Sequence, residues 1–381
     1  MNDAKMGFYD LMTDLITDPT QIVTAEIVVP CADIRVEMPY FQKVLGFRLD
    51  KIFPADDPAV AVVSGHGLIL RLECDADAAP VTIRLACDNP NKFAEGQTTF
   101  KTPSGNSIIA FQHNPPLFKP ETQHVFAVRR LVDEAPWVIG RAGMLYRDLV
   151  PDRLGGSIIA SHIRIPDGGP VPDMVHYHTI GFQLIYCYRG WVRLVYEDQG
   201  PEFILNAGDC VIQPPEIRHR VLEASDNVEV VEIGVPADHE TTIDHDMELP
   251  NDILNPNRKF SGQMFVRHQL KDASWQPWRI AGFEHRDTGI FNGTQGVANV
   301  QVARFKGGRP KPTRHSSDIL FTFILEGRMT LTGEGQDPCV LSPGDAFVVP
   351  PHFTTSYADC SHDLELLEVS LPGRFETLEI D

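Results

Sequence analysis

The sequence feature that most constrains the fold of this chain is an internal duplication in its C-terminal part. LIYCYRGWVRL at 184–194 matches FTFILEGRMTL at 321–331, and NAGDCVIQPP at 206–215 matches SPGDAFVVPP at 342–351. Short apolar runs that alternate with glycine and proline are typical of strands joined by turns. The repeat therefore indicates two copies of one β-rich unit in tandem.

Three histidines in the first copy have the spacing of a metal site. His176 and His178 lie two positions apart on an expected strand, so both side chains point to the same face. His219 belongs to a later strand that can meet them inside a barrel. One histidine alone would more simply be a packing residue, but three converging imidazoles can hold a divalent metal and leave positions open for substrate.

The spacing around these histidines resembles the two sequence motifs of the cupin superfamily. The motifs read Gly169 … His176-x-His178-xxxx-Gln183-xxxxxx-Gly190 and Gly208-xxxxx-Pro214-x-Glu216-xx-His219. The resemblance covers residues 140–373 and implies a mainly β bicupin, with two double-stranded β-helix (jelly-roll) barrels arranged as in gentisate dioxygenases. It places the first barrel at 156–236 and the second at 290–373, with connectors at 116–155 and 237–289.

Gln183 stands where most cupins carry a glutamate ligand. A neutral amide binds a divalent ion more weakly than a carboxylate, so we expect a three-histidine site with Gln183 as an optional fourth ligand. Such a metal keeps more positive charge, which favours an anionic or chelating substrate. Gln183 is also the candidate catalytic residue, through a hydrogen bond to a reacting oxygen. The resemblance favours Fe(II), while Ni, Mn or Zn also suit imidazole ligands.

The second barrel departs from the metal pattern. Alignment of the two copies places Thr313, His315, Leu320 and Thr355 opposite His176, His178, Gln183 and His219. One histidine cannot hold a metal, so we expect this barrel to be a scaffold, a lid or a second pocket. The alternative is that His352, which aligns with Glu216, turns inward beside His315.

Strand alternation also predicts the side chains near the site. Counting from Gln183, Ile185 and Cys187 point into the barrel, whereas Tyr186 and Tyr188 point outward. We expect Arg218, which follows the turn before His219, to point away from the cavity into solvent.

The N-terminal part predicts a small α+β domain at 21–115, preceded by a short amphipathic helix or leader at 1–20. A strand at 22–30 and a helix at 34–45 are followed by strands at 47–53, 58–64 and 68–74. This βαβββ order and the FQKVLGF end of the helix resemble half of a glyoxalase-like (vicinal oxygen chelate) domain. A second half with strands at 80–87 and 102–112 follows, and its helix is expected to be missing.

The ligand positions of the glyoxalase-like family are poorly filled. Glu26 falls on the first position and Glu73 or Arg71 near the second, whereas Val81 or Thr82 and Ile109 fall on the later ones. Carboxylates without a histidine make a poor transition-metal site. We expect a degenerate domain that serves interaction, dimerisation or substrate gating.

Composition narrows the possible partners. The net charge of −19 argues against nucleic acid and anionic membranes. Seven scattered cysteines without a CxxC pair favour a reducing compartment. The sequence offers no secretory signal or membrane-spanning run, so a cytoplasmic protein is expected.

These observations favour a metal-dependent dioxygenase that acts on a small enolic, phenolic or diketo acid chelated to the metal. Two alternatives stay open: an isomerase, lyase or hydrolase that uses the metal only as a Lewis acid, and a non-catalytic module that binds or senses a small carboxylate. The bicupin resemblance also leads us to expect a homo-oligomer.

Overall fold

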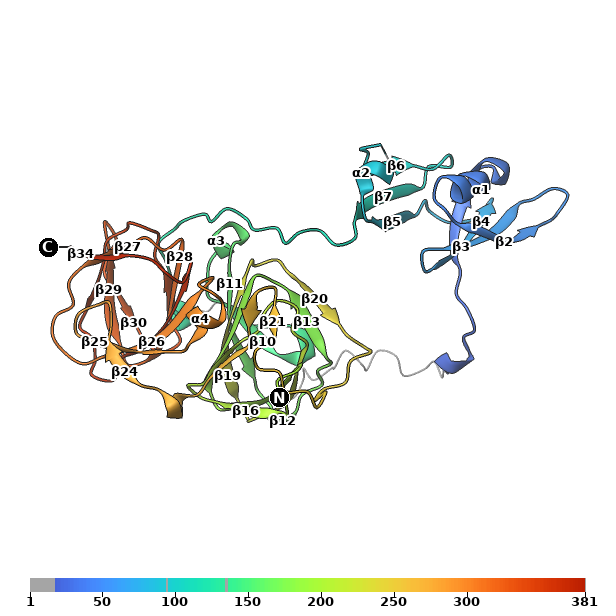
Figure 1. Ribbon diagram of the computed structural model, residues 1–381. Coiled ribbons are helices and arrows are strands. Elements are labelled where there is room, and N and C mark those ends of the chain that lie inside the picture. The colour runs from blue at the N-terminus through green and yellow to red at the C-terminus, as the bar shows by residue number, and fades with distance from the viewer. Residues whose placement is uncertain (1–17, 94, 134–135, 381) are drawn as a thin grey trace, which may run out of the picture. The chain divides into compact units, whose positions relative to one another are not determined.

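The computed structural model describes residues 18–93, 95–133 and 136–380, which form two compact units, Met1–Pro116 and Leu117–Asp381 (Figure 1). The protein is mainly β. Most of the expected leader helix at 1–20 lies outside the described residues, and Pro19–Gln21 form a 3₁₀ turn. Among the described helices, none has the length and apolar character needed to cross a membrane.

The first half of the N-terminal unit has the βαβββ order predicted from the sequence. It comprises β1 (Ile27–Cys31), α1 (Ile34–Lys43), β2 (Arg48–Phe53), β3 (Val60–Gly65) and β4 (Leu68–Cys74). The sheet order is β1-β4-β3-β2, and β1 runs parallel to β4. Helix α1 begins where the Asp33 carboxylate accepts a hydrogen bond from the Arg35 amide, and it buries Ile34 and Phe41.

The second half of this unit is shorter. It contains β5 (Thr82–Cys87), α2 (Pro90–Phe93), β6 (Thr99–Lys101) and β7 (Ser107–Gln112), in the sheet order β5-β7-β6. The one turn of α2 stands where the sequence suggested no helix. Both halves share one core, in which Val29 and Leu70 of the first half cluster with Ile83 and Ile108 of the second.

The C-terminal unit contains two barrels, each made of two sheets. The first has a seven-stranded sheet, β23-β17-β14-β19-β11-β10-β9, and a second sheet, β16-β15-β18-β13-β20, with β12 beside β18. Its elements are β9 (Val138–Ile139), β10 (Leu145–Asp148), α3 (Arg153–Gly156), β11 (Ile159–Ile165), β12 (Gly169–Pro170), β13 (His176–Thr179), β14 (Phe182–Arg189), β15 (Trp191–Tyr196), β16 (Phe203–Asn206), β17 (Cys210–Ile212), β18 (His219–Ala224), β19 (Val228–Val235), β20 (Glu240–Ile243) and β23 (Val266–His268).

The second barrel repeats this plan, as the duplication predicts. Its sheets are β24-β25-β26-β33-β28-β31-β8 and β30-β29-β32-β27-β34. Its elements are β8 (Ala127–Arg129), β24 (Trp275–Pro277), β25 (Phe283–Asp287), α4 (Ile290–Gly293), β26 (Asn299–Phe305), β27 (Thr313–His315), β28 (Ile319–Glu326), β29 (Met329–Gly333), β30 (Cys339–Leu341), β31 (Ala346–Val348), β32 (Thr355–Ala358), β33 (Glu365–Leu371) and β34 (Thr377–Glu379). The hairpin of β21 (Lys259–Phe260) and β22 (Gln263–Met264) lies between them in sequence.

The two barrels pack through their large sheets. Tyr186 and Tyr188 belong to a core shared with Phe321 and Phe323 of the second barrel. Cys187 belongs instead to the core inside the first barrel, beside the partly buried Ile185. The predicted alternation along β14 is thus confirmed, and the outward tyrosines contact the other barrel.

Each barrel receives one strand from the segment that precedes the other barrel in sequence. Strand β8 lies before the first barrel but pairs with β31 of the second, and β23 lies before the second barrel but pairs with β17 of the first. The segments 116–155 and 237–289, which the sequence suggested as connectors, therefore each contribute a strand to the seven-stranded sheet of a barrel. The exchange is reinforced by two fully buried arginines. Arg147 donates to the Gly344 carbonyl and Arg286 to the Gly208 carbonyl, each across the interface.

Candidate metal centre

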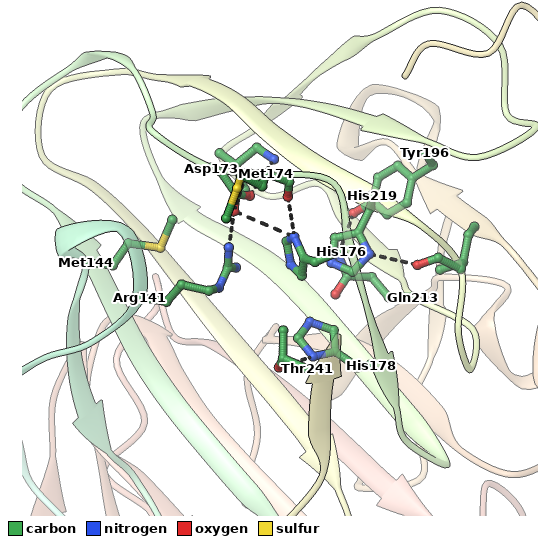
Figure 2. Close-up of polar contacts among 12 residues, drawn as sticks. Arg141, Met144, Asp173, Met174, His176, His178, Tyr196, Gln213, His219 and Thr241 are labelled. Carbon is green, nitrogen blue, oxygen red and sulfur yellow. Dashed lines mark hydrogen bonds and ion pairs between the residues drawn. The ribbon is translucent and has the colours of Figure 1, made fainter. Parts of the chain in front are cut away.

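The structure brings His176, His178 and His219 together inside the first barrel. His176 and His178 project from β13, and His176 lies opposite His219 of β18 in the strand register. One ring nitrogen from each lies within 4.8 Å of the others, and all three side chains are buried. Figure 2 shows the three rings turned toward one another. In the part of the chain that the structure describes, this is the one group of three or more histidine, cysteine or acidic side chains placed to hold a metal ion.

Hydrogen bonds orient these rings as metal ligands. His176 Nδ1 lies 2.8 Å from the Met174 carbonyl, and His219 Nδ1 lies 2.9 Å from the Ile217 carbonyl. A carbonyl can only accept, so both Nδ1 atoms carry the proton and both Nε2 atoms keep a free lone pair. His176 Nε2 is buried without a partner, as expected for an atom that needs a metal. The residues present therefore fit a divalent metal bound by imidazole.

All three imidazoles are held neutral. Burial is the largest effect, and it lowers the pKa of His176, His178 and His219. The neighbouring His176 and His239 add to the shift of His178, whose pKa falls to about 3. At neutral pH a metal would displace no proton from these rings.

A layer of polar side chains surrounds the histidines (Figure 2). The Thr241 hydroxyl lies 2.8 Å from His178 Nδ1. The buried Asp173 carboxylate lies 3.6 Å from His176 Nδ1 and forms an ion pair with Arg141. The same carboxylate accepts from the Met174 and Val221 amides, which fixes its position. Sequence spacing missed Thr241 and Arg141, because they reach the site from other segments, and it missed Asp173 because this residue, three positions before His176, belongs to no motif.

Gln183 is buried in β14 and paired with an unexpected partner. Its Nε2 donates to Glu232 Oε1 of the neighbouring strand β19 over 2.6 Å. Its Oε1 is buried without a hydrogen-bond partner. The contact with Glu232 thus fixes the amide through its N–H group and leaves the Oε1 lone pairs without a donor. Whether Gln183 is a ligand stays a prediction.

A cavity of about 70 Å³ adjoins the histidines. Its polar wall includes His178, His219, Arg141, Gln213 and Glu232, and the rest is mainly aliphatic. Gln213 Nε2 donates to the Tyr196 hydroxyl, and the Tyr196 ring stacks on His219. The arrangement suits a small molecule with one polar, anionic end and a short apolar body.

The equivalent position in the second barrel has one histidine in an unsuitable state. Thr313 lies opposite Thr355 as His176 lies opposite His219, which confirms the alignment of the copies. His315 Nδ1 accepts from the Ser317 amide over 3.1 Å, so its proton is on Nε2 and neither ring nitrogen keeps a free lone pair for a metal. His352 is exposed on a turn and does not join it.

Ion pairs decide two further predictions, on Arg218 and on the acidic residues of the N-terminal unit. Arg218 does not line the cavity, as expected, but the expectation of a solvated side chain is wrong, because Arg218 pairs with Asp244 at 3.0 Å and lies over the Tyr177 ring. In the N-terminal unit, Arg71 lies between Glu26 and Glu73, at 3.9 and 2.6 Å. A guanidinium therefore neutralises the carboxylates considered there as metal ligands.

Comparison with known proteins identifies the fold. The family description "Cupin domain" matches residues 302–364, in the second barrel. No curated protein matches the sequence. A salicylate 1,2-dioxygenase from Pseudaminobacter salicylatoxidans is similar with a TM-score of 0.51 and 15% identity, over 69% of this chain and 90% of that one. A variant of that enzyme in complex with gentisate gives 0.51 and 14%, over 68% and 87%. Oxalate decarboxylase from Bacillus subtilis gives 0.49 and 15%, over 68% and 81%. The chain thus contains a cupin domain and has a bicupin fold.

Proposed function

We propose that the first barrel is a metal-dependent enzyme site, and that it acts as a dioxygenase on a small enolic, phenolic or diketo acid. The observation that carries the proposal is the convergence of three buried, neutral imidazoles, two of which are fixed by backbone carbonyls with Nε2 free. The chain resembles a salicylate 1,2-dioxygenase in fold, and this resemblance is the reason that we propose a dioxygenase before other metal-dependent reactions.

The site offers distinct roles to protein and metal. When bound, a divalent metal, Fe(II) by preference, would supply Lewis acidity toward substrate oxygens and an open position for O₂. Arg141 lines the cavity and binds Asp173 through Nη1, so its remaining N–H groups can donate to a substrate carboxylate. Ile185, Leu194 and Val230 exclude water from the reacting end. The roles proposed for Gln183, a hydrogen bond to a reacting oxygen or weak ligation as a fourth ligand, are supported by its Oε1, which is buried without a hydrogen-bond partner.

The metal assignment predicts about one divalent ion per chain in the purified protein, measured by elemental analysis. His176→Ala should lose that ion, because two imidazoles without the third bind far more weakly. The matched control is His315→Ala in the second barrel, which should keep it. Full metal content in His176→Ala, or loss only in His315→Ala, would contradict the assignment.

The dioxygenase assignment needs its own measurement. An oxygen electrode should record stoichiometric O₂ uptake when the metal-loaded protein turns over a hydroxy or diketo acid, and His176→Ala should abolish that uptake. Turnover without oxygen uptake would favour the isomerase or lyase alternative. Unchanged ligand after prolonged incubation would favour a binding module.

A further inference from the structure

Both barrels carry a glutamate at the same place on the same strand, but only one of them is neutralised. Glu232 of β19 pairs in register with Ser161 and Ile185, and Glu368 of β33 pairs with Gln301 and Thr322. Glu368 is buried and accepts hydrogen bonds from Nε and Nη2 of Arg279. This two-pronged contact uses both carboxylate oxygens and cancels the charge.

Glu232 lacks such a cation. Arg141 precedes β10 as Arg279 precedes β25 in the second barrel. Arg141, however, pairs with Asp173 and not with Glu232. The partner of Glu232 is the neutral amide of Gln183, which donates to Oε1, and no hydrogen bond reaches Oε2 from the described residues. The second barrel has Leu320 in place of Gln183. The first barrel therefore holds its carboxylate by one oxygen and keeps the other available.

The carboxylate of Glu232 lines the same cavity as His178, His219 and Arg141. A ligand that fills the cavity shields Glu232 Oε2 from water, which is unfavourable unless the ligand supplies a hydrogen-bond donor of its own. The cavity volume of about 70 Å³ is also roughly half of the ~150 Å³ that holds a benzene molecule. The free acceptor favours a ligand with a hydrogen-bond donor, and the small volume favours a ligand of few atoms.

We propose that Glu232 is the specificity-determining residue of this site and narrows the proposed substrates to short aliphatic acids that carry a hydroxyl donor, as an alcohol or an enol, in preference to phenolic acids and to diketo acids in the keto form. The inference rests on the proposed function, because the carboxylate end of the ligand is assigned to the metal and Arg141. The hydroxyl of the ligand donates to Glu232 Oε2, while Gln183 acts as a positioning residue that fixes Oε1. A ligand with only acceptors at this point faces an unpaired carboxylate.

The test compares lactate with pyruvate, which have equal charge and the same number of non-hydrogen atoms but differ in the hydroxyl donor. Full-length protein is loaded with Co²⁺, and each acid is titrated while the visible absorption of Co²⁺ is recorded. We expect lactate to bind about tenfold or more tighter than pyruvate. In Glu232→Gln the amide can present N–H groups instead, so the preference should fall by about tenfold or reverse. Glu202→Gln, an equal charge change at an exposed position, should leave it unchanged.

Because lactate also chelates free metal well, the decisive quantity is the change in preference between wild type and Glu232→Gln. The same preference in both proteins, or no preference in wild type, overturns the inference while Co²⁺ binding leaves the metal site standing. Failure of the wild type to take up Co²⁺ overturns the proposed function itself. If Glu232→Gln does not fold, Glu232→Leu replaces it, with the same loss expected and the same result decisive.

Discussion

At the scale of single residues, the second barrel differs from the first in the state of the one histidine that it keeps at the aligned positions. His178 and His315 occupy equivalent positions, yet backbone contacts fix His315 with its proton on Nε2. Burial, followed by the charge of Arg279, lowers the pKa of His315 to about 4. The residue is therefore a neutral packing group at physiological pH.

This lowered pKa predicts a pH dependence of stability. Below the ordinary pKa of 6.5 the unfolded chain binds a proton at His315 and the folded protein does not, so stability falls as the pH drops from 6.5 to about 4. Relative to His315→Gln, wild type should lose about 2 kcal/mol of unfolding free energy between pH 7 and pH 5. Urea unfolding at both pH values measures this, and parallel losses in the two proteins would contradict it.

Residue spacing predicted the histidine triad because two ligands share one strand and the third belongs to a known motif. It could not find Glu232 or Arg141, since their places depend on which segments become neighbours, and it passed over Asp173, which lies only three residues before His176 but belongs to no motif. Gln183 illustrates the limit of spacing: the motif singled out the residue, but its hydrogen-bond partner Glu232 lies 49 residues away on β19.

At the scale of elements, the aspartates of the two repeated Gly-Asp turns bind the segments that carry the exchanged strands β8 and β23. Asp345 accepts from the amides of Ser342 in its own turn and of Leu131, which follows β8. Asp209 does the same with Asn206 and with Leu270, which follows β23. Each aspartate therefore stabilises one turn and one incoming segment.

Removal of either aspartate should destabilise the barrels to a similar degree. Asp345→Ala leaves two amide donors without their acceptor, which costs about 3 kcal/mol, and the same holds for Asp209→Ala. Asp337→Ala, at an exposed position, is the control and should change little. Denaturant midpoints measure the effect. A control-like midpoint for Asp345→Ala would show that the contacts across the exchange contribute nothing.

The elements themselves were largely predictable, because alternation and turn residues are local signals. The βαβββ run and the strands of both barrels illustrate this. The pairing of β8 with β31 and of β23 with β17 was not predictable, since it joins segments far apart in sequence whose few residues carry no pattern of their own.

At the scale of the whole molecule, the two compact units, Met1–Pro116 and Leu117–Asp381, have separate cores. Calorimetry should therefore show two unfolding transitions. Added Co²⁺ should raise only the transition of the C-terminal unit, since binding to the native state stabilises that state alone. Val63→Ala, in the N-terminal core, should lower only the other. A single transition shifted by both changes would contradict independent units.

The exchange of strands between the barrels limits which parts of the chain can be deleted. Deletion of everything from residue 266 onward would remove β23 from the first barrel's sheet and Arg286 from its Gly208 turn. Any selection for an intact first barrel therefore also preserves the folded shape of the second, while the positions of the second barrel that align with the three histidines stay free to vary. The first barrel cannot be completed without residues of its neighbour.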